Sequence, residues 1–248
     1  MEDAVFNSLM DFGVSLLECG AEVSRVEDSL KRTGAAHGYS KMQVFVITSC
    51  IIVTLTGPDG ETKTQIRRIL TPPSTNFALL EELNKLSRHY CECPSEDFSR
   101  LLEGIHVPHS RGGIRLGAAL AAGFFALFFG GSFYDALAAG GVGILLTLLS
   151  GHIYSISSNQ LIYHLLCSFL SGLCIGLLTR LFPFLHGDMI LIGEIMLLIP
   201  GIAMTNSVRD LLTGNTISGL LRLIETSTWA LALADGFMLS MWMTGMAG

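Results

Sequence analysis

Charged residues are scarce in the second half of this 248-residue chain. Residues 116–248 contain three Lys or Arg and six Asp or Glu, whereas residues 1–115 contain 12 and 15. Residues 116–134 carry no charge, and residues 136–179 carry none over 44 positions. Uncharged runs of this length are typical of membrane-spanning helices. We therefore expect a polar domain at residues 1–111, followed by a membrane domain at residues 112–248.

Motifs of catalysis and nucleic-acid binding are also missing. The chain has no Walker A loop, no Gly-x-Ser-x-Gly and no His-Glu-x-x-His, so we expect neither ATP hydrolysis nor an intramembrane hydrolase. The net charge is −6, and the sequence has no basic stripe interleaved with aromatic residues. Both features argue against nucleic-acid binding. Six cysteines lack zinc or disulfide spacing, which predicts free thiols. We expect no enzyme activity, no metal and no cofactor; His106 and His109 are expected to be solvated.

The first 111 residues have the pattern of a small α+β domain. Helical spacing of apolar residues predicts helices over residues 3–18 and 22–37, which end near Gly20 and Gly38. Residues 42–56 are rich in Val, Ile and Thr, with a break near Ser49. The turn residues 57–60 lead into an alternating stretch at 61–70, so a hairpin is expected. Two further helices are expected at residues 75–90 and 95–104.

Five membrane spans are expected, at residues 116–134, 136–152, 161–179, 189–205 and 227–246. Four remain if the fourth segment re-enters the membrane instead of crossing it. Arg111 and Arg115 precede the first span, Arg209 and Arg222 lie between the fourth and fifth, and Arg180 alone lies on the other side. Because basic residues favour the cytoplasmic side, the N-terminal domain is expected in the cytoplasm. Without a signal peptide, the bacterial inner membrane is the expected location.

Residues 188–226 carry polar groups that a purely structural membrane helix does not need. Glu194 lies in a predicted span, and Pro200-Gly201 interrupts the helix. Ionisable groups in a span are costly, and a proline leaves backbone groups that only protein or water can satisfy. Broken helices of this kind occur at the substrate sites of secondary transporters. The alternative is a kinked packing helix with one protonated glutamate.

Candidate site residues follow from this pattern. On a straight helix, Glu194, Gly201, Thr205 and Arg209 would lie roughly on one face, because their spacing is close to whole turns. Arg209 is expected to bind a carboxylate, since guanidinium matches that geometry. An acid would carry a coupling proton or meet an ammonium, and Asp235 could instead pair with Arg209. The expected substrate contacts are Arg209, Asn206, Thr205, Pro200, Gly201 and Asn215, and the expected acids are Glu194, Asp235 and Asp210.

Two sets of motifs give a resemblance to a known family. Gly20-Ala-Glu-Val-Ser-Arg-Val-Glu-Asp-Ser-Leu30 precedes the hairpin, and Leu198-Ile-Pro-Gly201 and Asn206-Ser-Val-Arg-Asp-Leu-Leu-Thr-Gly-Asn215 lie in the membrane domain. With these motifs the chain resembles the threonine/serine exporter (ThrE) family over nearly its whole length. It is most similar to the larger component of the two-part version, the YjjP-like proteins.

The resemblance implies a function and a partner. The function is export of threonine or serine or, in some members, of a dicarboxylate such as succinate. The partner is a smaller membrane protein of the same family, with its own Pro-Gly helix. The number of copies in the assembly stays open. A membrane-anchored sensor, in which only the cytoplasmic domain binds a ligand, is the alternative of another class; substitution of Glu194 and Arg209 distinguishes it, because an anchor tolerates both changes.

Overall fold

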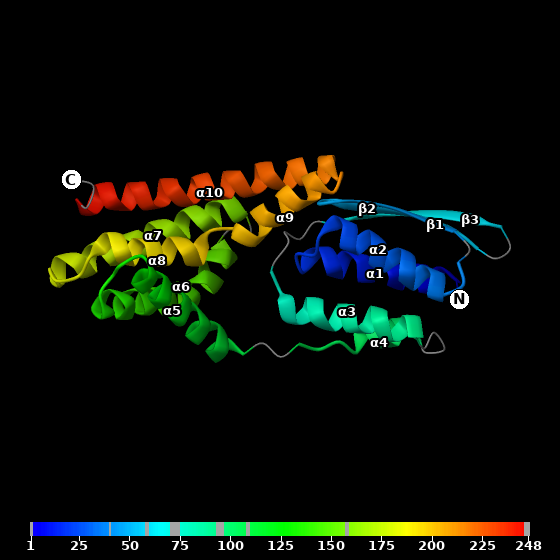
Figure 1. Cartoon of the computed structure of the whole chain (residues 1–248), viewed down its shortest axis with the longest axis horizontal. Coiled ribbons are helices and arrows are strands. Elements are labelled where there is room, and N and C mark those ends of the chain that lie inside the picture. The colour runs from blue at the N-terminus through cyan, green and yellow to red at the C-terminus, as the bar shows by residue number, and fades with distance from the viewer. Residues whose placement is uncertain are drawn as a thin grey trace. The chain divides into compact units, whose positions relative to one another are not determined.

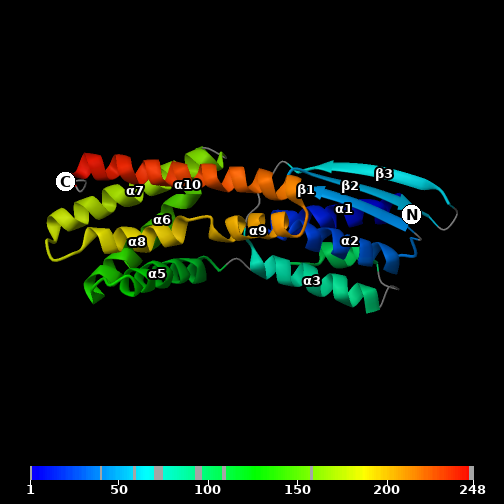
Figure 2. The same ribbon diagram turned by 45° about the horizontal axis from the view of Figure 1, so that its top comes forward.

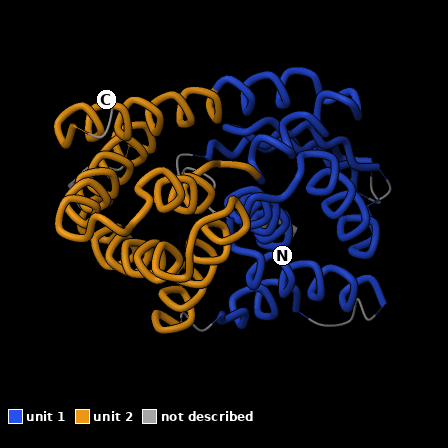
Figure 3. Tube along the Cα trace, turned by 60° about the vertical axis from the view of Figure 1, so that its left-hand side comes forward, with its two compact units in different colours: residues 1–108, 202–224 blue, residues 109–201, 225–248 orange. Residues whose placement is uncertain are grey.

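The computed structural model describes residues 2–39, 41–57, 60–69, 75–92, 97–107, 110–156 and 159–245. The chain forms two compact units, which Figure 3 colours separately. Unit 1 consists of Met1–Pro108 and Ile202–Ile224, and unit 2 of His109–Gly201 and Glu225–Gly248. The segment 202–224, which falls in the predicted membrane domain, thus groups with the N-terminal residues. The predicted domain boundary at residue 111 stays a prediction.

Unit 1 contains a three-stranded antiparallel sheet with helices against it (Figures 1 and 2). Helix α2 packs on β1 and α1 on β2. The sheet order is β1-β2-β3, with Val44 opposite Val53 and Ile52 opposite Ile66. The elements are α1 (Glu2–Glu18), α2 (Val23–Ala36), β1 (Lys41–Ile47), β2 (Cys50–Thr56), β3 (Thr62–Arg68), α3 (Phe77–Glu92), α4 (Phe98–Glu103), α9 (Gly201–Leu212) and the start of α10 (Thr216–Thr244).

The expected helices and hairpin of the N-terminal domain are present, and the break near Ser49 separates β1 from β2. The alternation in β2 turns Ile51, Val53 and Leu55 inward, where they pack against apolar residues of α1 and α2. Burying each such side chain contributes roughly 1.5–3 kcal/mol. Residues 58 and 59 of the turn, and residues 70–74 and 93–96 before two helices, lie outside the described residues.

Unit 2 is a bundle of apolar helices that approach one another closely. It contains α5 (Arg111–Phe128), α6 (Phe133–Ile156), α7 (Gln160–Leu181), α8 (Gly187–Leu198) and the rest of α10. A Cβ at Gly123 would lie 2.9 Å from the carbonyl oxygen of Ala136, so α5 and α6 nearly touch through their backbones. Large apolar side chains face outward, among them Leu116, Phe124, Phe128, Phe133, Leu137 and Trp242. An apolar exterior around a close-packed interior fits a membrane protein.

Three described helices, α5, α6 and α7, are long and apolar enough to cross a membrane. They become four if the bent pair α8 and α9 is one span. The fifth expected span, residues 227–246, lies mostly in α10, where Asp235 and several Ser and Thr residues lower the hydropathy. The count of five therefore stays a prediction.

Substitution of Gly193 by alanine is expected to destabilise unit 2. A Cβ there would lie 2.5 Å from the Ala122 carbonyl oxygen, so α8 must move away from α5. Forced overpacking of this kind costs about 1–3 kcal/mol. Gly141→Ala on α6 is the matched control, because a Cβ there meets nothing within 4 Å and alanine favours the helix. Thermal unfolding of the detergent-solubilised protein measures both; equal midpoints would contradict the close α5–α8 packing.

Candidate functional site

The predicted break at Pro200-Gly201 is present. Helix α8 ends at Leu198 and α9 begins at Gly201, so the helix is interrupted at the proline. Ile199, the residue before the proline, is extended with φ −62° and ψ 134°, as the clash with a following proline ring requires. The Gly201 N–H donates to the Ile199 carbonyl at 2.8 Å. A straight-helix alignment of Glu194 with Arg209 therefore does not apply.

Glu194 is buried in unit 2 without a polar partner. Its side chain is 0% exposed, and neither carboxylate oxygen has a hydrogen-bond partner among the described residues. Ile190 and Leu198, one turn before and after it, are buried as well, so Glu194 lies on the inner face of α8. An isolated ionised carboxylate costs several kcal/mol in such surroundings. Glu194 is thus suited to hold a proton and to ionise only when water or a cation reaches it.

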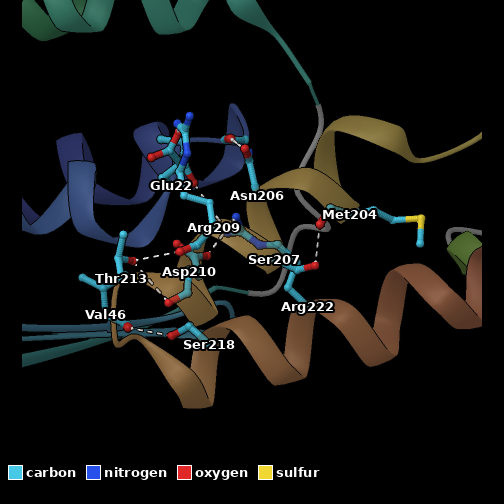
Figure 4. A network of polar contacts seen from close by, with 12 residues as sticks. Glu22, Val46, Met204, Asn206, Ser207, Arg209, Asp210, Thr213, Ser218 and Arg222 are labelled. Atoms are coloured by element: carbon cyan, nitrogen blue, oxygen red, sulfur yellow. Dashed lines mark hydrogen bonds and ion pairs between the residues drawn. The ribbon is translucent and has the colours of Figure 1, made fainter.

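The polar residues of α9 contact the turn between α1 and α2 (Figure 4). The Asn206 side-chain amide donates to the Gly20 carbonyl at 3.2 Å, and Arg209 forms an ion pair with Glu22. From α10, the Arg222 guanidinium contacts the Ala21 carbonyl at 3.5 Å. Gly20 has φ +86°, a conformation that glycine adopts easily and that lets the chain turn here. Three consecutive turn residues are therefore held from α9 and α10.

A buried ion pair joins α9 and α10 close to these contacts. Arg222 and Asp210 are 3.4 Å apart, with 6% and 0% of their side chains exposed. Nearby, the Ser218 hydroxyl donates to the Val46 carbonyl at 3.1 Å, and the Val46 N–H donates to Glu27 at 3.2 Å. Because β1 is an edge strand, these bonds satisfy backbone groups that the sheet leaves open. From the sequence, Arg222 was used only to predict the orientation of the chain in the membrane, and no partner was predicted for it.

The other expected contacts on this segment have different surroundings. Thr205 is exposed on α9. Asn215 lies in the turn between α9 and α10: its N–H donates to the Asp210 carbonyl at 2.9 Å, and its carbonyl accepts from Gly219. The preceding Gly214 has φ +91°. Structure thus brings Asn206, Arg209 and Asp210 together in unit 1, whereas Glu194 and Asp235 belong to unit 2.

Comparison with known families gives one match. The family model ThrE, described as "Putative threonine/serine exporter", matches residues 7–243. The chain belongs to the threonine/serine exporter family. This confirms the family resemblance and a membrane exporter class that is not an enzyme family. No curated protein and no solved structure matches the chain.

Two of the three motifs that carry the family resemblance meet in this structure. The first begins at Gly20 and the last begins at Asn206, and these two residues share a hydrogen bond although they are 186 positions apart. The Arg209–Glu22 pair joins the same two motifs. In this member of the exporter family, residues of the first and last motifs therefore form one contact, between α9 and the α1–α2 turn.

A second buried acid of unit 2, Asp135, was not among the site residues predicted from the sequence. It accepts hydrogen bonds from the backbone N–H groups of Ser132 (2.7 Å) and His186 (2.8 Å). Its other contact is the His186 imidazole, with Nδ1 at 2.9 Å. Ser132 also accepts a bond from the Asp135 N–H, which completes a capping box at the start of α6. Asp135 is fully partnered and therefore structural, in contrast to Glu194. The Ser-x-x-Asp spacing was the available signal.

The remaining predictions on single residues concern metal and thiols. The described cysteines, Cys19, Cys50, Cys91, Cys167 and Cys174, are free; Cys93 lies outside the described residues. His106 is exposed and contacts the Gly104 carbonyl, while His109 also lies outside them. Within the described residues, no group of three or more His, Cys, Asp or Glu could hold a metal ion.

Proposed function

We propose that this chain is one subunit of a secondary exporter that moves threonine or serine out of the cytoplasm, driven by the proton gradient. Membership of the threonine/serine exporter family supports the substrate class. The observation that carries the coupling is Glu194, fully buried with both carboxylate oxygens unpartnered among the described residues. A proton is the smallest ligand that removes the cost of burying this charge. Loss of the proton would drive a change of conformation around α8.

Arg209 is the proposed contact for the substrate carboxylate. Its side chain is 57% exposed while it pairs with Glu22. A substrate carboxylate can replace that of Glu22, because both fit a guanidinium in the same way. Asn206, Thr205 and the backbone around Pro200-Gly201 would supply the remaining hydrogen bonds. Asp210 forms an ion pair with Arg222, and Asn215 forms backbone hydrogen bonds. In this proposal both residues stabilise α9 and do not contact the substrate.

A second membrane protein is the proposed partner. Asp235 is exposed on α10 among the exposed apolar residues Leu231, Met238 and Leu239. An acid on a lipid-facing helix is costly, so a partner that supplies a polar group is favoured. An apolar cavity of about 450 Å³ between α8 and α10 includes its neighbours Ala234 and Met238. We propose that the smaller family component covers this face, and higher oligomers are compatible with it.

The proposed location is a bacterial inner membrane, with the N-terminal domain in the cytoplasm. Arg111 and Arg115 at the start of α5 support that orientation. The description of the family names threonine and serine, and gives no support to succinate export or to a sensor.

Efflux of labelled threonine from preloaded cells tests the proposal. The chain is produced alone, with its smaller partner, and with the partner as Arg209→Gln. We expect partner-dependent efflux that falls to background in the variant. Arg68→Gln is the matched control, because Arg68 is an exposed arginine of β3 outside this network. Threonine efflux that is absent under every pairing, with protein present in the membrane, would contradict export.

A further inference from the structure

A cleft lies between α2 and α3 in unit 1. It has a volume of about 730 Å³, within the range of small-molecule sites. From α2 and its N-cap residue Glu22, it is lined by Glu22, Arg25, Asp28 and Arg32, which recur every three or four residues and so lie on one side of the helix. This cleft is separate from the acid in the bundle, since all its lining residues belong to unit 1.

Helix α3 provides the opposite wall by the same spacing. Glu81, Asn84 and Arg88 lie three and four residues apart and line the cleft. The Asn84 amide nitrogen donates to the Leu80 carbonyl at 2.7 Å. That bond fixes the side chain by one donor and leaves the amide oxygen as an acceptor.

The carboxylates that line the cleft have ion-pair partners, whereas two of its arginines have none among the described residues. Each lining carboxylate has a cation: Glu22 pairs with Arg209, Asp28 with Arg32 at 3.2 Å, and Glu81 with Lys85 at 3.0 Å. Arg25 and Arg88 line the same cleft and have no ion pair or hydrogen bond among the described residues. One guanidinium comes from each wall. The cleft therefore contains two arginines that can bind a ligand, next to carboxylates that already form ion pairs.

This arrangement selects a ligand that carries both signs. A carboxylate suits Arg25 and Arg88, because guanidinium binds carboxylates through two parallel hydrogen bonds. An ammonium suits the Asn84 oxygen and the carboxylates that frame the cleft. A dianion would meet the acids of both walls at close range, and like charges repel. A zwitterion satisfies both sets of groups at once.

We propose that the α2–α3 cleft is a binding site for a small zwitterionic amino acid, and that its occupancy is transmitted through Glu22. The choice of threonine or serine as the ligand rests on the proposed export function. Glu22 belongs both to the cleft and to the pair with Arg209. A ligand ammonium at Glu22 competes with Arg209 for the same carboxylate and frees Arg209. The N-terminal unit would thus report the internal amino-acid level to α9.

Calorimetric titration of the purified full-length chain without its partner tests this site. L-threonine is compared with threonine amide, which lacks the carboxylate, and with succinate. We expect threonine alone to bind, and the Arg25→Gln/Arg88→Gln variant to lose about tenfold or more in affinity. Arg88→Lys, which keeps the charge but not the two-pronged geometry, should fall between. Circular dichroism verifies that the variants are folded.

Two controls separate this site from the export site. Arg68→Gln on β3 should bind as the unchanged protein does, and Arg209→Gln should keep or strengthen binding, since Glu22 becomes free. If threonine binding is lost in Arg209→Gln and kept in Arg25→Gln/Arg88→Gln, the cleft is not the binding site. That result would leave the proposed export function intact. No binding of threonine by the chain would overturn the cleft as well. Cleft binding together with absent efflux would support the cleft and contradict the proposed export function.

Discussion

Efflux of threonine is expected to fall to background when Glu194 is replaced by glutamine, while the protein stays folded. Glutamine has nearly the shape of the protonated acid and carries no charge. The side chain is fully buried, so a neutral amide fits the surroundings of α8 at least as well as an ion does. Stability should therefore be kept, but the residue can no longer take up or release a proton. Proton-driven transport then has no carrier at this position.

Asp188→Asn is the matched control for this change. Asp188 lies in the first turn of the same helix, α8, and its side chain is exposed. The same exchange of acid for amide is made there, away from the buried face. We expect efflux close to that of the unchanged protein. Efflux measured with the partner, at several external pH values, gives the readout. If Glu194→Gln keeps the full rate and its pH dependence, Glu194 is a packing residue and the coupling proposal is wrong.

Unit 1 is expected to lose about 3–5 kcal/mol of stability when Arg222 is replaced by glutamine. The change leaves Asp210 buried without its cation, and its side chain is 0% exposed. It also removes the contact to the Ala21 carbonyl. By contrast, Arg209→Gln breaks an ion pair whose arginine is 57% exposed, and such pairs contribute about 0–1 kcal/mol. The loss of stability should thus be much larger for Arg222→Gln than for Arg209→Gln.

The double variant Asp210→Asn/Arg222→Gln separates the charge effect from simple loss of packing. Without Asp210, no buried charge is left uncompensated, so part of the lost stability should return. Thermal unfolding in detergent, followed by limited proteolysis of the N-terminal unit, measures all four proteins. Equal stability of Arg222→Gln and Arg209→Gln would show that the buried pair does not hold α10 to the N-terminal unit.

Local patterns predicted most elements of the fold. Apolar spacing placed α1 and α2 to within a few residues, and the Val, Ile and Thr content placed the strands. The break at Pro200 was predictable because a proline restricts its own residue and the one before it. The prediction of spans was weaker at α10, where Asp235 and several Ser and Thr residues interrupt the apolar sequence.

Long-range pairs of the candidate site could not be predicted from these patterns. Arg209 and Glu22 are 187 positions apart, and no periodicity links them. Asp210 and Arg222 meet across the turn at Gly214, a geometry that helical spacing does not encode. The sequence therefore identified Arg209, Asn206 and Asp210 as unusual for a membrane helix but not their partners. For Asp135 the local signal was present, a Ser three positions earlier, and only its contact with His186 was hidden.

Simultaneous recording of threonine and proton flux is the most direct test of the account. The purified chain and its smaller partner are reconstituted in liposomes that contain labelled threonine and a pH-sensitive dye. A pH gradient is then imposed. We expect threonine to leave as protons move the opposite way, and both fluxes to disappear together in Glu194→Gln. Threonine flux that ignores the gradient, or no threonine flux at all from the reconstituted pair, would contradict a proton-driven threonine exporter.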